Sequence, residues 1–135
     1  MQGRLFTGTF WSASYEPLHR LAVFERSTAP VVDLGLVDDE VAALAAALEP
    51  VERRRAAALI DLRAAPLDPR ADADALWARH RLAFAGYRRY ALVVRTAVGK
   101  LQISRLARAT AAPAGVFFDP AEARLFCRQT AAPPA

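Results

Sequence analysis

The chain has 135 residues, of which 54% are hydrophobic and 24% charged, the composition of a globular protein with one sizeable core. Its longest uninterrupted apolar run, residues 41–48, is far shorter than the roughly 20 residues that a membrane-spanning helix needs. No long hydrophobic region follows the opening MQGRLF, so we expect neither a signal peptide nor a transmembrane segment. The single cysteine, Cys127, excludes an internal disulfide and favours a cytoplasmic location.

The formal net charge of +4 is unevenly distributed along the chain. Residues 1–52 carry three arginines and eight carboxylates, a net of −5, whereas residues 53–135 carry fifteen basic and six acidic side chains, a net of +9. A basic half of this kind suits phosphate or an acidic protein surface. However, the basic residues are interspersed among the predicted strands and helices, and no aromatic-basic stacking motif accompanies them. We therefore expect no nucleic-acid partner.

The first part of the chain is predicted to form an antiparallel hairpin. Residues 5–15 are rich in Phe, Trp, Thr and Tyr, which favour an extended strand, and Glu16-Pro17 supplies a turn. Residues 18–26 alternate between two faces, as the returning strand of a hairpin does. A connection over residues 27–37 then leads to a helix that we expect Asp38 to cap and Pro50 to end.

The remainder of the chain alternates between strands and helices. Short apolar strands are predicted at residues 57–62, 89–95 and 115–119. Each leads into a helix, with the predicted N-caps Asp68, Thr96 and Asp119. This order predicts an α/β fold, in which an N-terminal β-hairpin precedes βα units and helices pack on a mixed, mostly parallel sheet. We expect a single domain over residues 1–128 and a flexible C-terminal tail at 129–135.

Three motifs bear a resemblance to a known family: ALIDLR followed by a loop and helix, the strand RRYALVVRT, and VFFDPAEA near the C-terminus. With these motifs, residues 5–128 resemble a STAS-type domain, the fold of anti-sigma-factor antagonists. The similarity is greatest to the divergent SpoIIAA-like group, which in turn resembles SEC14 lipid-binding domains. The resemblance implies a bacterial regulatory module that binds another protein, without a cofactor and without catalysing a reaction.

The resemblance also implies a switch residue that this chain lacks. In the antagonist branch, a phosphorylatable Ser or Thr follows the strand equivalent to residues 57–62. The corresponding residues here carry no hydroxyl group; they are Arg63, Ala64, Ala65, Pro66, Leu67 and Asp68. We therefore predict a non-enzymatic protein-interaction module that has lost the phospho-switch and binds its partner through these six residues.

Two other ligand classes stay open at this point. The similarity to SEC14 domains implies, as an alternative, a binder of lipid or another apolar ligand, with the aromatic helix over residues 68–86 covering a cavity against the sheet. An anion is the second possibility, because Arg63, Arg95 and Thr96 follow parallel strands beside two predicted helix N-termini. An enzyme is the weakest hypothesis, since it would require an anionic substrate at the two arginines.

The remaining reactive side chains favour structural roles. His80 lies on an apolar helical face without a nucleophile nearby, so we expect a core or boundary histidine. Cys127 is expected to be a buried, inert thiol. Two histidines and one cysteine, widely separated, predict no metal site. The edge hairpin could pair with a symmetry mate, which makes a homodimer plausible.

Overall fold

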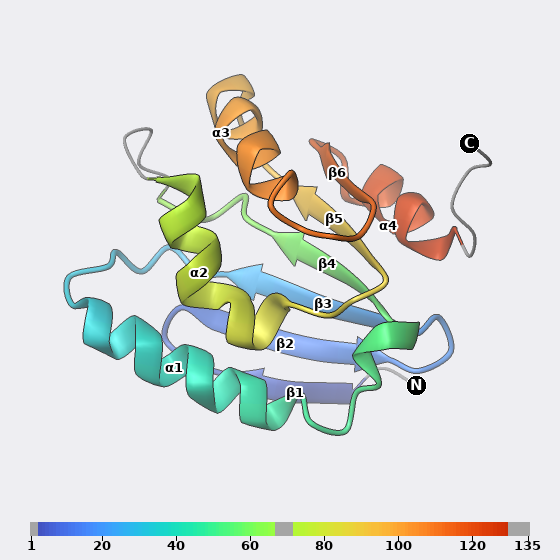
Figure 1. Cartoon of the computed structure of the whole chain (residues 1–135), viewed down its shortest axis with the longest axis horizontal. Coiled ribbons are helices and arrows are strands. Elements are labelled where there is room, and N and C mark those ends of the chain that lie inside the picture. The colour runs from blue at the N-terminus through green and yellow to red at the C-terminus, as the bar shows by residue number, and fades with distance from the viewer. Residues whose placement is uncertain (1–2, 67–71, 130–135) are drawn as a thin grey trace.

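The computed structural model describes residues 3–66 and 72–129, which form a six-stranded sheet with helices on both faces (Figure 1). The order of the strands in the sheet follows the chain: β1 (Gly3–Thr7), β2 (Trp11–Glu16), β3 (Leu21–Arg26), β4 (Ala57–Asp61), β5 (Arg89–Val93) and β6 (Ala114–Phe117). β1, β2 and β3 pair antiparallel, whereas β3 to β6 are parallel neighbours. The predicted α/β class, with a mostly parallel sheet and an antiparallel N-terminal edge, is confirmed.

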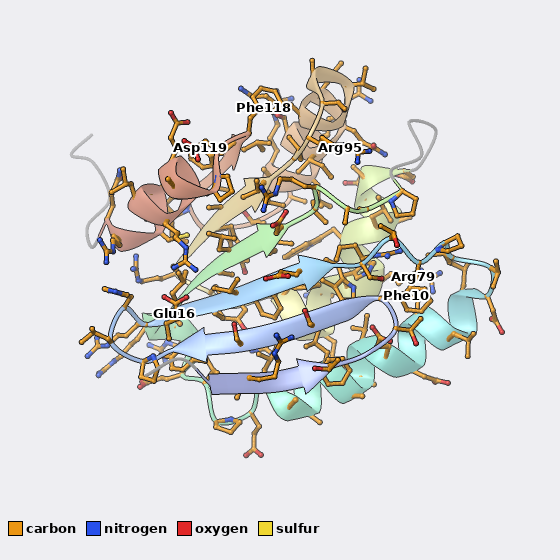
Figure 2. The ribbon with its side chains drawn as sticks, turned by 180° about the vertical axis from the view of Figure 1, so that it is seen from behind. Phe10, Glu16, Arg79, Arg95, Phe118 and Asp119 are labelled. Carbon is orange, nitrogen blue, oxygen red and sulfur yellow. The ribbon has the colours of Figure 1, made fainter. Side chains whose placement is uncertain are left out.

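Four α-helices cover the sheet unequally. They are α1 (Leu34–Ala47), α2 (Ala73–Phe84), α3 (Ala97–Ala107) and α4 (Pro120–Arg128), and a short 3-10 turn, η1, spans Arg53–Arg55. The first three lie over one face, and α4 lies on the other (Figure 1). Seen from behind, α4 lies over the parallel half of the sheet, and β1 and β2 are left uncovered on this face (Figure 2).

The helices divide the apolar residues into two cores. The larger core lies under α1, α2 and α3 and includes Phe24, Leu44 and Ile103. The smaller core lies under α4 and includes Leu59 and Cys127. All five residues of β5 are buried, because this strand has helices on both of its faces.

The first predicted strand is wrong in one respect: residues 5–15 form two strands, with a turn between β1 and β2. The Gly8 amide donates to the Trp11 carbonyl at 2.8 Å to close this turn. A Cβ on Gly8 would lie 2.6 Å from the carboxyl carbon of Glu40, closer than real Cβ contacts come. A side chain at position 8 would therefore displace the Glu40 carboxylate from the turn.

The first helix begins earlier than predicted. Asp33 is its N-cap and accepts from the Gly35 amide at 2.8 Å, so the assignment of Asp38 as the cap is wrong. Asp38 instead lies inside α1, where its carboxylate pairs with Arg79 of α2. Because Asp33 caps the helix, the carboxylates of Asp38 and Glu40 in its second turn are available for contacts with other elements.

The other helix caps follow local sequence more closely. Thr96 accepts from the Gly99 amide at 3.0 Å and Asp119 from the Ala121 amide at 2.9 Å, which confirms both predicted caps. α2 is capped by Asp72, one turn later than expected, and the predicted cap Asp68 lies outside the described residues. The same is true of residues 130–135 of the predicted tail.

Glu40 fastens the β1–β2 turn to α1. Its carboxylate accepts three backbone hydrogen bonds, from the amides of Thr9 at 2.7 Å, Phe10 at 2.8 Å and Trp11 at 2.7 Å. Hydrogen bonds to an ionised acceptor are roughly twice as strong as neutral ones. This single side chain therefore satisfies the donors of a whole turn and sets the position of the two aromatic residues that follow it.

Replacing Glu40 with alanine should destabilise the protein by about 2–4 kcal/mol, because three amides lose their acceptor together. Glu49→Ala is the matched control, since Glu49 is exposed just beyond α1, and it should change stability by less than about 0.5 kcal/mol. Urea unfolding followed by circular dichroism measures both. Equal unfolding midpoints for the two variants would contradict the role given to Glu40.

Candidate functional site

A cavity of about 540 Å³ lies between the sheet and α1, α2 and α3. Such a volume is typical of small-molecule sites, which span about 300–1,000 Å³. The backbone of α2 lies closer to α1 and α3 than to the strands, which α2 contacts through aromatic side chains such as Phe84. Residues that end β3 or follow β4 line the cavity, including Arg26, Leu62 and Pro66. The cavity therefore lies toward the carboxyl ends of the parallel strands, where α/β sheets commonly bind ligands.

Aromatic rings form much of the cavity wall. Six of the lining residues carry a ring: Phe10, Trp11, Trp77, His80, Phe84 and Tyr90. The Trp11 ring meets Phe84 edge-on at a centroid distance of 4.9 Å and His80 at 5.9 Å. Edge-to-face pairs at these distances hold each other in place. The wall is thus a preformed apolar surface contributed by the β1–β2 turn, β2, β5 and α2.

Two arginines bring positive charge to this apolar space. The Arg26 guanidinium lies 5.1 Å above the centre of the Phe10 ring, and its Nη1 donates to the Ser27 carbonyl at 2.7 Å. Arg79 Nη1 lies 2.5 Å from a carboxylate oxygen of Asp38. Burial lowers the pKa of Arg26, partly offset by the charge of Glu40, but the group stays cationic at neutral pH. Among the described residues that line the cavity, none is a carboxylate.

His80 takes the structural position that its helical face predicts. Its Nδ1 lies 2.8 Å from the Leu76 carbonyl, one turn earlier in α2. Burial lowers the pKa of the imidazole, the Leu76 carbonyl opposes this, and the charges of Arg26 and Arg79 lower it further. The ring is therefore neutral at pH 7, with its proton on Nδ1 directed to the carbonyl.

The Trp11 indole supplies a buried donor to the same wall. The residue is 5% exposed, and its Nε1 has no hydrogen-bond partner among the described residues. Leaving a buried N–H unsatisfied disfavours the folded state by about 1–3 kcal/mol.

The residues predicted to bind a partner lie beside the cavity. Arg63 is held by Asp61, with its Nε 3.0 Å and its Nη2 2.8 Å from the carboxylate oxygens. Burial raises the pKa of Asp61, but the Arg63 hydrogen bonds outweigh it and hold the pKa below its usual value. Ala64 is exposed, whereas Ala65 is buried and lines the cavity with Pro66. Leu67 and Asp68 lie outside the described residues, and partner binding by this segment stays a prediction.

The residues predicted to bind an anion have partners of their own or lie at the surface. Arg63 is paired with Asp61, and the Thr96 hydroxyl caps α3. Arg95 is exposed just past the end of β5 (Figure 2). None of the three lines the cavity, whereas Arg79 does. An anion site at these residues stays a prediction.

Cys127 lies on the opposite face of the sheet from the cavity. Its side chain is buried under α4, with Sγ 3.8 Å from the Ala58 carbonyl. Burial raises the pKa of the thiol to about 11, so little thiolate exists at neutral pH. Within residues 3–66 and 72–129, no cluster of three His, Cys, Asp or Glu side chains could hold a metal ion. The helices of these segments include none long and apolar enough to cross a bilayer.

Sequence reasoning placed a possible cavity under the second helix but missed its charged residues. Arg26 ends an otherwise apolar strand, and Arg79 lies three residues before Leu82 on a mostly apolar helix. The sequence signal that could have identified them was an arginine beside the apolar residues of each element. Neither position was informative until the fold placed β3 and α2 around the same cavity.

The burial of His80 predicts a pH dependence of stability. Its pKa is below the ordinary 6.5 in the folded chain, so the unfolded chain takes up a proton first as the pH falls. The stability associated with the neutral ring is therefore lost as the pH decreases below about 6.5. Urea unfolding at pH 7.5 and 5.5 should show a smaller loss for His80→Gln than for the wild type. An equal loss in both proteins would contradict the assignment.

Comparisons with known proteins support the fold. No family model and no curated protein matches the chain. A crystal structure of an uncharacterized protein from Shewanella loihica PV-4, described as a DUF3478 family member with a SpoIIAA-like fold, superposes on it with a TM-score of 0.56. The match covers 94% of this chain and 92% of that one at 16% sequence identity. Together with the strand order and the helix arrangement, it shows that this chain has the SpoIIAA-like fold.

Proposed function

We propose that the protein is a non-enzymatic binding protein that holds an apolar small molecule in the cavity beneath α2. The observation that carries this proposal is the aromatic-lined space of about 540 Å³ within the main core. Protein interiors are close-packed and contain few voids larger than a water molecule. A cavity of this volume is therefore better explained by a ligand than by imperfect packing.

The polar groups of the cavity support binding in preference to catalysis. The Tyr90 hydroxyl donates to the Phe84 carbonyl at 2.6 Å, and the Thr110 hydroxyl donates to the Ala107 carbonyl at 2.9 Å. The Nδ1 of His80 is likewise directed to a backbone carbonyl. A general base needs a position within hydrogen-bond reach of the proton it removes, and these groups instead stabilise α2 and the turn after α3.

Protein interaction through residues 63–68 is the second candidate function. Pro66 favours it, since this residue is exposed at the surface and also lines the cavity. The described part of the segment, residues 63–66, is thus in contact with the ligand space on one side and with solvent on the other. A partner that binds this segment would sense whether the cavity is filled.

Filling the cavity should abolish binding of an apolar probe. Ala65→Trp introduces the largest side chain at a lining position, and Ala64→Trp places the same side chain on the exposed neighbour. With the neutral dye N-phenylnaphthylamine (NPN), titrated by fluorescence, Ala65→Trp should weaken binding at least fivefold. Ala64→Trp should leave the affinity within twofold of the wild type.

The wild-type titration tests the proposal most directly. A saturable fluorescence increase with NPN, or a co-purified small molecule in native mass spectrometry, would support a ligand cavity. Failure of NPN to bind the wild type, or equal affinity of the two tryptophan variants, would contradict the proposed function.

A further inference from the structure

We propose that the cavity selects amphiphiles with an anionic head group, held by Arg26 beside the apolar chamber. This inference rests on the proposed function and names the class of ligand. The head group is a carboxylate, sulfonate or phosphate attached to an apolar body. The shared chemistry is one negative charge joined to a hydrophobic group that fits among aromatic rings.

The first observation in support of this proposal is the distribution of charge in the cavity. Arg26 and Arg79 supply its charge among the described lining residues. Arg79 is paired with Asp38, whereas Arg26 forms no ion pair within the described parts of the chain. Glu40 acts on Arg26 through space, but its oxygens already accept the three amides of the β1–β2 turn. Among the described lining residues, Arg26 is thus the cation that has no carboxylate partner.

The second observation is the position of Arg26. The side chain is half-buried, with its guanidinium against the face of Phe10. A partly desolvated guanidinium binds an anion more strongly than one in bulk water, and its planar fork suits carboxylate and sulfonate oxygens. Phe10 and Arg79 are found at the same end of the sheet (Figure 2). The positive groups therefore occupy one end of the chamber.

The third observation is that the rest of the cavity wall is apolar. Trp77, Phe84 and Ile103 offer an apolar surface that suits an aromatic or aliphatic body. The exposed lining residues Val31, Leu34 and Pro66 mark the opening of the cavity. A small inorganic anion would leave this apolar surface unfilled, and a neutral hydrocarbon would leave the Arg26 charge without an anionic partner. An amphiphile satisfies both.

Two dyes with the same ring system test this directly. Anilinonaphthalene sulfonate (ANS) carries a sulfonate that NPN lacks. Arg26→Gln should weaken ANS roughly tenfold, the typical effect of losing a charge-assisted contact, and change NPN affinity less than twofold. Unchanged NPN binding also shows that the variant keeps the folded cavity. Arg95→Gln removes an equal charge from the surface outside the cavity, and it should leave ANS binding unchanged.

Displacement of NPN then separates the sources of the anion. Dodecanoate should displace the dye at a lower concentration than dodecanol, and Arg26→Gln should remove this preference. Inorganic phosphate should not displace it.

The outcomes are distinguishable. Equal effects of Arg26→Gln on ANS and NPN, no effect on either, or displacement by phosphate alone would overturn the head-group assignment while leaving the apolar cavity in place. An equal loss of ANS binding in Arg95→Gln would move the anion to the surface and overturn it as well. Absence of binding of both dyes to the wild type would overturn the proposed function itself.

Discussion

The carboxylate of Glu40 joins the first helix to the first hairpin, and the geometry of the candidate site depends on that contact. Three consecutive amides, those of Thr9, Phe10 and Trp11, donate to its two oxygens. Gly8 is needed immediately before them, because any Cβ there would collide with the same carboxylate. Phe10 and Trp11 follow directly into the cavity wall. The hydrogen bonds of Glu40 therefore position Phe10, whose ring lies under Arg26, and Trp11, whose ring contacts α2.

The cavity is a consequence of how the helices share the sheet. α4 lies directly on the parallel strands and forms a small core with them, whereas α2 is supported at its sides by α1 and α3. Aromatic contacts such as Trp11 with Phe84 hold α2 in place from beneath. Additional links hold it from the sides, including the ion pair between Arg79 and Asp38. A helix supported in this way leaves space between itself and the strands.

Polar side chains around this space form hydrogen bonds with the backbone at the end of α2. Arg53 donates to the carbonyls of Leu82 and Ala85 at the end of α2, so the helix C-terminus is satisfied from outside the cavity. Gly86, with a φ of +95°, then turns the chain toward β5. The Trp11 indole is an exception within the described residues, since its buried N–H has no partner. The Arg26 guanidinium distinguishes the cavity from an ordinary gap in the core.

Local chemistry made several elements predictable. Thr96 and Asp119 act as caps through amides only two or three residues away, so the neighbouring sequence is enough to predict their roles. The start of α1 was mispredicted because Asp33 and Asp38 both have a cap's local sequence. Asp38 is assigned to another role by Arg79, which lies 41 residues away. The merged first strand has the same cause, since the residue that stabilises its turn is Glu40 on a different element.

The sequence by itself determined the fold class, the alternation of strands and helices from β3 onward, the partial burial of His80 and the burial of Cys127, because each depends on periodicity or on neighbours along the chain. It also determined that residues 63–68 carry no hydroxyl for a phospho-switch. Only the tertiary structure decided that Ala65 and Pro66 line a cavity and that Arg26 and Arg79 both face it. These residues come from three separate elements, and their separation in space is set by the packing of α2. Long-range packing of this kind has no local signature, which is why the ligand space became visible only in the folded chain.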